Sequence, residues 1–225
     1  TGVGSVSTPN GLSAPVGVYD QDGKTIRYVY AGDMLGNVWK FDLNGAGSAT
    51  RLFTAVGPAS NVQPISGGLA VAIHPVTKKR WVFFGTGRFL TTGDADSTSV
   101  ATQSMYGFED TGTTLTRANL QSRGAPVVSG NVRTFQAKGT LPAGMKGWYI
   151  DLTTASGERI VQDSQVVSTF LITASMVPTG DACEADGTGY INALDAFTGT
   201  SAGGSYFDQN RNGDTSDDKV GGVPI

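Results

Sequence analysis

The sequence is short of the residues from which many active sites are built: its 225 residues include one cysteine, Cys183, and one histidine, His74. A single cysteine cannot form a disulfide within the chain, and a single histidine with no Gly-x-Ser-x-Gly segment does not give a hydrolase triad. No apolar run approaches the ~20 residues that span a bilayer, and no charged and then apolar signal segment opens the chain. We therefore expect no membrane span, and either a signal that has been removed or an internal fragment.

The sequence also lacks clustered positive charge and helical periodicity. It has 16 basic and 19 acidic residues with a net charge of −3, and the basic residues are scattered, so nucleic acid is not an expected partner. No stretch repeats apolar residues at the three-to-four spacing of a helix, whereas alternating patterns and short apolar runs recur throughout. The 32 glycines suit a chain with many tight turns. Together these features predict an all-β fold.

What the sequence does contain is a repeat, which is clearest in residues 28–45. An aromatic run at Tyr28–Tyr30 ends at Asp33, and after a turn containing Gly36 a second run at Val38–Phe41 ends at Asp42. Aromatic and β-branched residues bounded by glycine, asparagine and aspartate are typical of two strands joined by a tight turn. Residues 28–45 are therefore predicted to form a β-hairpin.

Reduced copies of this hairpin recur three more times. The acidic residues that close the second run are Asp42, Glu109, Asp151 and Asp195, so the intervals are 67, 42 and 44 residues. Removing an insertion of roughly 15 residues that begins at Arg88 leaves a spacing near the ~40–50 residues of a four-stranded propeller blade. The spacing predicts a β-propeller with about four visible blades, centred near residues 14–45, 69–112, 125–157 and 160–199.

On this interpretation residues 1–225 are a single β-propeller domain or the C-terminal portion of one, with residues 1–13 as a loosely held lead-in and residues 205–219 as a separate loop. Four segments, one from each repeat, should then occupy equivalent strands of successive antiparallel sheets. These segments are Val38–Phe41, Tyr106–Phe108, Trp148–Ile150 and Tyr190–Leu194.

Residues 208–218 carry the one pattern with specific chemistry. Oxygen-bearing side chains at the first, third and fifth positions and glycine at the sixth match the calcium loop D-x-[DN]-x-[DN]-G. Alternate residues on such a tightly curved loop point inward, and the residue after the glycine would add its backbone carbonyl. Lys219 replaces the closing glutamate, so the last two aspartates would have to complete the shell; the alternative is a plain turn. The predicted Ca²⁺ ligands are Asp208, Asn210, Asn212, Asp214, Asp217 and Asp218.

Other stretches have ordinary structural interpretations. Asp20 and Asp22 could begin a second calcium loop, but Lys24 sits where a third oxygen ligand is needed, which favours a turn. The segment Gly85–Arg88 follows an aromatic strand and precedes no helix, which favours a blade turn over a phosphate cradle. Cys183 has two interpretations, a bridge to a segment outside this chain or a buried free thiol.

The repeats resemble those of the type IV pilus tip-associated adhesins of the PilY/PilC type, in their C-terminal propeller domain. The similar segments follow the family order over nearly the whole chain: Tyr30–Leu43, Val82–Phe89, Gly147–Leu152 with Gly157–Arg159, and Ser175–Pro178 through Cys183 to Leu194–Gly199. The resemblance implies a non-enzymatic, calcium-dependent β-propeller that is exported through the periplasm to the cell surface or pilus tip. It further implies a role in pilus assembly, extension and adhesion. The implied partners are pilus subunits (minor pilins), a host or surface receptor and the N-terminal remainder of the same protein.

The sequence departs from the family pattern in two ways. The family's calcium loop commonly precedes the Tyr-Ala-Gly-Asp strand, where this chain has the weakened segment Asp20–Lys24. The ligands have therefore moved to residues 208–218, or binding is lost. The family propeller also has more blades than the four visible repeats, which implies a C-terminal portion of a longer protein.

Two other functions fit the same repeat. The pattern Gly-x-x-aromatic-x-apolar-Asp followed by Thr-Gly or Asn-Gly also resembles the quinoprotein dehydrogenases, which are enzymes with a quinone cofactor. Those enzymes usually carry a vicinal cysteine pair, whereas Cys183 is the only cysteine here. A propeller that acts as a scaffold for other envelope proteins shares the architecture. Quinone-dependent redox activity would identify the enzyme, and binding to pilus subunits would separate a pilus protein from a general scaffold.

Overall fold

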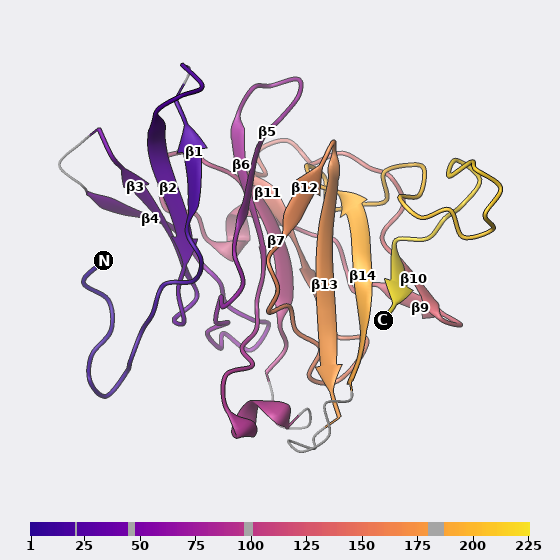
Figure 1. Cartoon of the computed structure of the whole chain (residues 1–225), viewed down its shortest axis with the longest axis horizontal. Coiled ribbons are helices and arrows are strands. Elements are labelled where there is room, and N and C mark those ends of the chain that lie inside the picture. Colours follow the sequence, from indigo (N-terminus) through magenta and orange to yellow (C-terminus); the bar gives the residue numbers. More distant parts are fainter. Residues whose placement is uncertain (21, 45–47, 97–100, 180–186) are drawn as a thin grey trace.

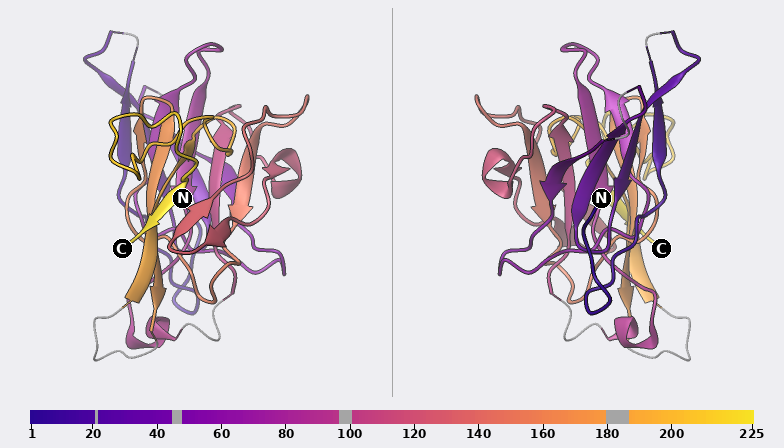
Figure 2. Two further views of the ribbon diagram at one scale, coloured as in Figure 1. Left: turned by 90° about the vertical axis from the view of Figure 1, so that its right-hand side faces the viewer. Right: turned by 90° about the vertical axis from the view of Figure 1, so that its left-hand side faces the viewer.

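The computed structural model describes residues 1–20, 22–44, 48–96, 101–179 and 187–225, and its secondary structure is almost entirely β. Within these residues the helices are two short 3₁₀ turns, η1 (Thr92–Ala95) and η2 (Arg117–Asn119). The strands form three sheets, which Figure 1 shows side by side and Figure 2 shows from both ends of the row. The predicted all-β fold class is confirmed.

The first sheet contains the predicted hairpin. Its strand order is β1 (Val16–Tyr19), β2 (Ile26–Gly32), β3 (Asn37–Asp42) and β4 (Ala49–Thr54), and all neighbours are antiparallel. Strands β2 and β3 pair with Tyr28 opposite Asp42. Gly36 in their turn has a φ of +77°, and a Cβ there would lie 2.7 Å from the carbonyl oxygen of Gln63. Only glycine fits this turn, because both its conformation and its surroundings exclude a side chain.

The second and third sheets are larger. The second has the order β5 (Ala70–Ile73), β6 (Arg80–Gly85), β7 (Ser104–Glu109), β11 (Gly147–Asp151) and β8 (Gln121–Ser122), with β8 parallel to β11. The third has the order β12 (Gln165–Val167), β13 (Phe170–Pro178), β14 (Gly187–Asp195), β15 (Gly222–Pro224), β10 (Val132–Thr134) and β9 (Val127–Ser129).

The strand pairing corrects the predicted number of blades, because the described residues form three sheets and not four. Strands β3, β7 and β14 are each the third strand of their sheet, as predicted for the segments they contain. The remaining segment, Trp148–Ile150, lies on β11, which pairs with β7 in the second sheet. The stretch 125–157 therefore divides between the second sheet and the third.

Glycines explain why β11 pairs with β7. Gly147 lies opposite Phe108, and a Cβ on Gly147 would lie 2.2 Å from the carbonyl oxygen of Gly107. A side chain at this position would push the two strands apart, whereas glycine lets them approach. The local pattern around Trp148 is the same as in the other repeats, so it does not reveal which strand it pairs with.

Strand β6 separates two hydrophobic cores. Val82 and Phe84 belong to a buried cluster that includes Tyr30 and Phe53 of the first sheet. The intervening side chains, Trp81 and Phe83, belong to a second cluster, which they share with residues of the third sheet and of the segment after β14: Leu171, Leu194, Ala196 and Phe197. Alternate residues of a strand point to opposite faces, so the second sheet is covered on both faces by its neighbours. Three sheets stacked in this way have the arrangement of consecutive propeller blades.

The lead-in is held more firmly at its end than predicted. Ser13 is buried, its backbone N–H donates to the carbonyl of Gly32 at 2.9 Å, and its hydroxyl accepts from the N–H of Gly32 at 3.0 Å. Asn10 donates to the fully buried carboxylate of Asp33 at 2.8 Å, and the indole of Trp39 donates to the same oxygen at 2.7 Å. Residues 10–13 therefore pack on the first sheet, and Trp39 is buried against this polar cluster.

Candidate functional site

The predicted calcium loop lies between β14 and β15 and is drawn in yellow in Figure 1. Its base is closed by Ser205, whose hydroxyl donates to the carbonyl of Val220 at 2.7 Å and whose N–H donates to the carbonyl of Thr215 at 2.9 Å. Ser205 and Val220 are buried, whereas most residues between them are exposed. The loop is therefore a surface element fixed at its two ends.

The side chains at the first, third and fifth loop positions turn inward, as the spacing predicts. Asp208 accepts hydrogen bonds from the N–H groups of Asn212 at 3.1 Å and Gly213 at 2.9 Å. Asn210 accepts from Asn212 N–H at 3.0 Å, and Asn212 accepts from Asp214 N–H at 2.7 Å. Gly213 has a φ of +85°, which allows the sharp bend. The structure thus brings Asp208, Asn210 and Asn212 onto one curved segment.

The three remaining predicted ligands lie in different places. Asp217 accepts from the amide groups of Asn210 at 3.1 Å and Asn212 at 2.9 Å, so it joins the inward-facing group. Asp218 is buried at the base and accepts from the N–H of Gln209 at 3.0 Å. The carboxylate of Asp214 accepts from Ser216 N–H at 2.8 Å, and hydrogen bonds from Ser216 lower the pKa of Asp214. That carboxylate is not part of the group.

The donor chemistry of this group suits a hard cation. Asp208 and Asp217 supply carboxylate oxygens, and Asn210 and Asn212 supply amide oxygens, which are the ligand types that Ca²⁺ takes. Within the described part of the chain, no three histidine, cysteine, aspartate or glutamate side chains come close enough to hold a metal. A cation at this loop would therefore have to be held by the mixed set of two carboxylates, two amides and backbone oxygen.

Two other predicted positions have structural roles. The imidazole of His74 accepts hydrogen bonds at Nδ1 from the N–H groups of Val76 at 3.1 Å and Thr77 at 3.2 Å, so it closes the β5–β6 turn. Asp22 accepts hydrogen bonds from the backbone N–H groups of Thr25 and Lys24. Both bonds lower the pKa of Asp22, and the bond from Thr25 has the larger effect. Cys183 lies outside the described residues.

A buried polar cluster that the sequence did not reveal joins the first two sheets. Asp110, directly after β7, accepts from the hydroxyl of Tyr30 and from the ammonium group of Lys40, both at 2.6 Å. Burial raises the pKa of Tyr30, and the hydrogen bond to Asp110 raises it further. For Asp110, burial acts upward, but the hydrogen bonds from Lys40 and Tyr30 outweigh it and lower the pKa. The charges thus favour an ionised Asp110 and a neutral Tyr30.

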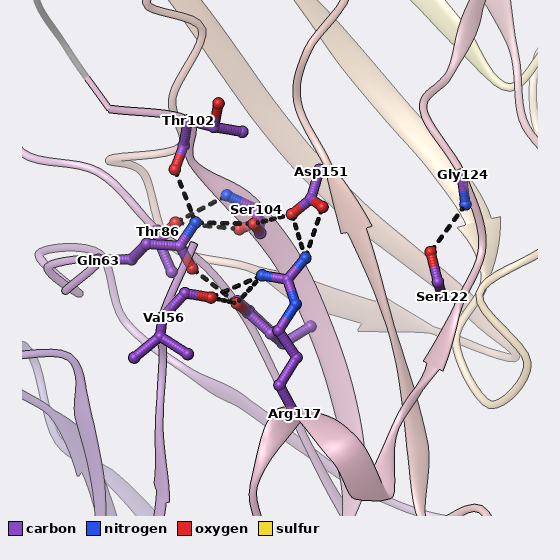
Figure 3. Close-up of polar contacts among 10 residues, drawn as sticks. Val56, Gln63, Thr86, Thr102, Ser104, Arg117, Ser122, Gly124 and Asp151 are labelled. Carbon is purple, nitrogen blue, oxygen red and sulfur yellow. Dashed lines mark hydrogen bonds and ion pairs between the residues drawn. The ribbon is translucent and has the colours of Figure 1, made fainter. Parts of the chain in front are cut away.

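A second polar cluster closes one end of the second sheet (Figure 3). Arg117 donates to both carboxylate oxygens of Asp151, at 2.6 Å to Oδ1, and the hydroxyl of Ser104 donates to the same Oδ1 at 2.6 Å. Tyr106 donates to the side-chain oxygen of Gln63 at 2.6 Å, and Gln63 donates to Ser104 at 2.8 Å. Burial raises the pKa of Tyr106 to about 12. These contacts are internal and leave the tyrosine neutral at physiological pH.

A third buried group joins β10 to the loop between β11 and β12. Arg133 and Glu158 are fully buried and form a two-pronged ion pair with distances of 2.7 and 3.0 Å. The Arg133 guanidinium also lies 3.7 Å from the centre of the Tyr190 ring. The sequence resemblance includes Glu158, but nothing in the sequence indicates Arg133 as its partner.

The chain is similar in sequence and in fold to PilY1 proteins. No family model matches the chain. Over 220 residues, or 93% of this chain, it is 36% identical to a type IV pilus biogenesis factor PilY1 homolog of Xylella fastidiosa, of which it covers 18%. It is 27% identical, again over 93% of its length, to the type IV pilus biogenesis factor PilY1 of Pseudomonas aeruginosa strain PAO1, of which it covers 22%. The chain thus spans about a fifth of the curated relatives that it matches.

A solved structure has the same fold. The crystal structure of the Pseudomonas aeruginosa PilY1 C-terminal domain superimposes with a TM-score of 0.78 and 23% identity, over 99% of this chain and 57% of that one. At this identity the likeness concerns the fold. The resemblance predicted from the sequence is confirmed, because the similar proteins are PilY1-type type IV pilus biogenesis factors.

Proposed function

We propose that this chain is a non-enzymatic part of a surface protein of the type IV pilus system, which acts in pilus assembly and extension and in adhesion. The observation that carries the proposal is the 36% identity to the Xylella fastidiosa PilY1 homolog over 93% of the chain. The relatives are named as pilus biogenesis factors, so a role in assembling the fibre is the function that the similarity favours. Minor pilins, a host or surface receptor and the N-terminal remainder of the protein are the proposed partners.

The architecture is consistent with a structural role. Each face of the second sheet is covered by an aromatic core, and the sheets are also joined by buried charges such as Lys40 with Asp110. Such interiors resist deformation, because separating the sheets would expose apolar surface and leave buried charges unpaired. Among the described residues no helix is long and apolar enough to cross a membrane. We propose an extracellular location at the pilus tip or cell surface, reached through the periplasm.

The test is direct capture of pilus subunits. The purified chain, immobilised, is exposed to purified minor pilins and, separately, to an unrelated acidic periplasmic protein. The proposal predicts saturable retention of at least one minor pilin and none of the control. The pilus proposal would be replaced by the dehydrogenase alternative under two joint results. The chain would retain neither the minor pilins nor the control protein, and it would reduce an added quinone when an oxidisable alcohol is present.

We further propose that the loop 208–218 binds Ca²⁺ through Asp208, Asn210, Asn212 and Asp217, with a backbone oxygen from Asp214 and support from Asp218 at its base. Four carboxylates lie within eleven residues of sequence, and a divalent cation would reduce their repulsion. The cation would also fix an exposed loop whose backbone otherwise keeps its entropy. A ligand that binds only the folded form stabilises it by about 2.7 kcal/mol at a hundred times its dissociation constant.

Calorimetric titration with CaCl₂ and thermal melting with and without chelator test this site. Asp208→Ala removes a carboxylate from the inward group and is expected to abolish the calcium heat and the chelator-sensitive shift in melting. Asp214→Ala is the matched control, because it removes a carboxylate that faces Ser216 and keeps the backbone carbonyl. It is expected to retain binding. A native chain that shows neither calcium heat nor a chelator effect would reduce the loop to a turn.

A further inference from the structure

A cavity of about 400 Å³ lies beside η1. Figure 1 draws this short turn at its lower edge. The cavity is walled on one side by aliphatic groups of the β2–β3 turn and of the connection to the second sheet, and on the other by charged and polar groups that flank the insertion after β6. The lining includes Met34, Val62, Pro64, Arg88, Gln103 and Arg159. Its size is within the range of sites that hold small ligands or a few residues of a peptide.

The cationic side of the cavity is fixed by Asp94. One oxygen of this carboxylate accepts from Nε of Arg88 at 2.9 Å and from its Nη2 at 2.8 Å. The other accepts from the N–H groups of Leu90 at 3.0 Å and Thr91 at 2.9 Å. The Arg88 side chain is 51% exposed, and within the described residues its Nη1 has no acceptor. A guanidinium held by two of its nitrogens can present the third to a carboxylate with little loss of side-chain entropy.

Arg159 adds a second positive charge behind the first. It is buried, and its Nη1 donates to the carbonyls of Arg88 at 3.0 Å and Asp94 at 2.7 Å. The two arginines and the single carboxylate of Asp94 leave the lining with one net positive charge. In a chain whose net charge is −3, the lining of this cavity is a local region of positive charge, which favours an anion over a cation.

Gln103 supplies a hydrogen-bond acceptor that the protein leaves unused. Its side chain is 4% exposed, and its Nε2 donates to the carbonyl of Ala101 at 2.8 Å. Its Oε1 is buried and has no donor within the described part of the chain. Buried polar atoms in folded proteins nearly always have partners, so an acceptor on a cavity wall points to a donor on a ligand.

We infer that this cavity binds a peptide segment of a partner protein through an acidic side chain and a neighbouring backbone N–H. The carboxylate contacts Nη1 of Arg88, and the N–H donates to Oε1 of Gln103. The aliphatic wall of Met34, Val62 and Pro64 packs against the methylene groups of the acidic residue. The described lining residues include no aromatic ring on which a sugar could stack, which favours a peptide over an acidic sugar.

Fluorescence anisotropy with the full chain and a labelled, capped peptide Ala-Ala-Glu-Ala-Ala tests the site, with the Gln-containing peptide and sialic acid as comparison ligands. The expected result is saturable binding of the Glu peptide and at least tenfold weaker binding of the Gln peptide, because hydrogen bonds to charged groups are the stronger ones. Arg88→Gln and Gln103→Leu should each weaken binding of the Glu peptide at least tenfold.

The matched control is Lys24→Gln, which removes one positive charge from the β1–β2 turn, at the opposite end of β2 from Met34. It should bind like the native chain. Gln103→Leu keeps the volume of the side chain and removes the unused acceptor, so its melting temperature should be preserved while binding is lost. Equal affinity for the Glu and Gln peptides, unchanged affinity in Gln103→Leu, or binding of sialic acid without binding of the peptide would each overturn the assignment.

Discussion

Tyr30 on β2 and Asp110 after β7 are 80 residues apart in the sequence, yet the Tyr30 hydroxyl donates to Asp110 at 2.6 Å. Lys40 donates to the same carboxylate oxygen at 2.6 Å. The contact joins the residue directly after the closing Glu109 of one repeat to the first strand of the previous repeat's hairpin. Neighbouring repeats are thus joined by an aromatic core between their sheets and by a buried cluster of charged and polar groups around Asp110 at the edge of that core.

Replacing Tyr30 with phenylalanine should lower the free energy of unfolding by about 1–2 kcal/mol, because the buried Asp110 loses one donor and keeps Lys40. Urea denaturation measures the difference. Tyr19→Phe is the control, since Tyr19 is 57% exposed and should tolerate the change. Equal stability of Tyr30→Phe and the native chain would show that the bridge contributes nothing.

Gly147→Ala tests the placement of β11 beside β7. A Cβ at this position would lie 2.2 Å from the carbonyl oxygen of Gly107, so the strands must separate, and we expect a loss above about 3 kcal/mol. Gly139→Ala is matched to it, because there the nearest atom to the added Cβ is the carbonyl oxygen of Ala137 at 3.7 Å. Chemical denaturation should show a small effect for Gly139→Ala. Similar stability of both variants would contradict the pairing.

Glu158→Gln should destabilise the chain by about 3–5 kcal/mol, because it leaves the buried charge of Arg133 without its counter-ion. Glu109→Gln provides the comparison, since its partner Lys79 is half exposed and such pairs contribute about 0–1 kcal/mol. Thermal unfolding of both variants at pH 7 separates the two cases. Equal shifts in melting temperature would mean that burial does not determine how much the Arg133–Glu158 ion pair contributes to stability.

Asp94 should make the chain sensitive to acid. Burial would raise its pKa, but hydrogen bonds from Arg88, Leu90 and Thr91 outweigh burial and lower the pKa from 3.8 to about 2. A carboxylate whose pKa is lower in the folded state than in the unfolded state stabilises the fold at pH values above its unfolded-state pKa. This stabilisation is lost as the pH falls through the folded-state pKa. The contribution of about 2 kcal/mol should therefore disappear between about pH 4 and pH 2.

The variant Asp94→Asn should be less stable than the native chain at pH 7 and should show a flatter dependence of stability on pH in this window. Urea denaturation at several pH values measures both slopes. Parallel curves for the native chain and the variant would remove Asp94 from the acid response.

The sequence was informative where local residues decide the structure. The hairpin of β2 and β3 follows from Asp33 and Gly36, because the aspartate accepts hydrogen bonds from backbone N–H groups within the turn and the glycine supplies its positive φ. In the same way, the spacing of Asp208, Asn210 and Asn212 predicted inward-facing oxygens, which the loop shows. Whether they bind a cation stays a prediction.

The sequence was uninformative where distant partners decide. Trp148 lies in a strand whose local pattern matches β3 and β7, so its pairing with β7 could not be predicted without the approach that Gly147 allows. Arg133 and Glu158 are single charges in unrelated stretches, and only the fold brings them within 2.7 Å. The predicted number of blades was wrong because the strand that contains Trp148 pairs with β7 and does not begin a sheet of its own.

The central claim, a role in building type IV pili, is tested most directly by counting surface pili by electron microscopy. Cells that produce the full-length protein are compared with cells whose protein lacks residues 16–224, and with cells that carry Gly139→Ala as a control for expression. We expect few or no pili on cells that carry the deletion and normal numbers on the control cells. Normal numbers of pili on cells that carry the deletion would contradict it.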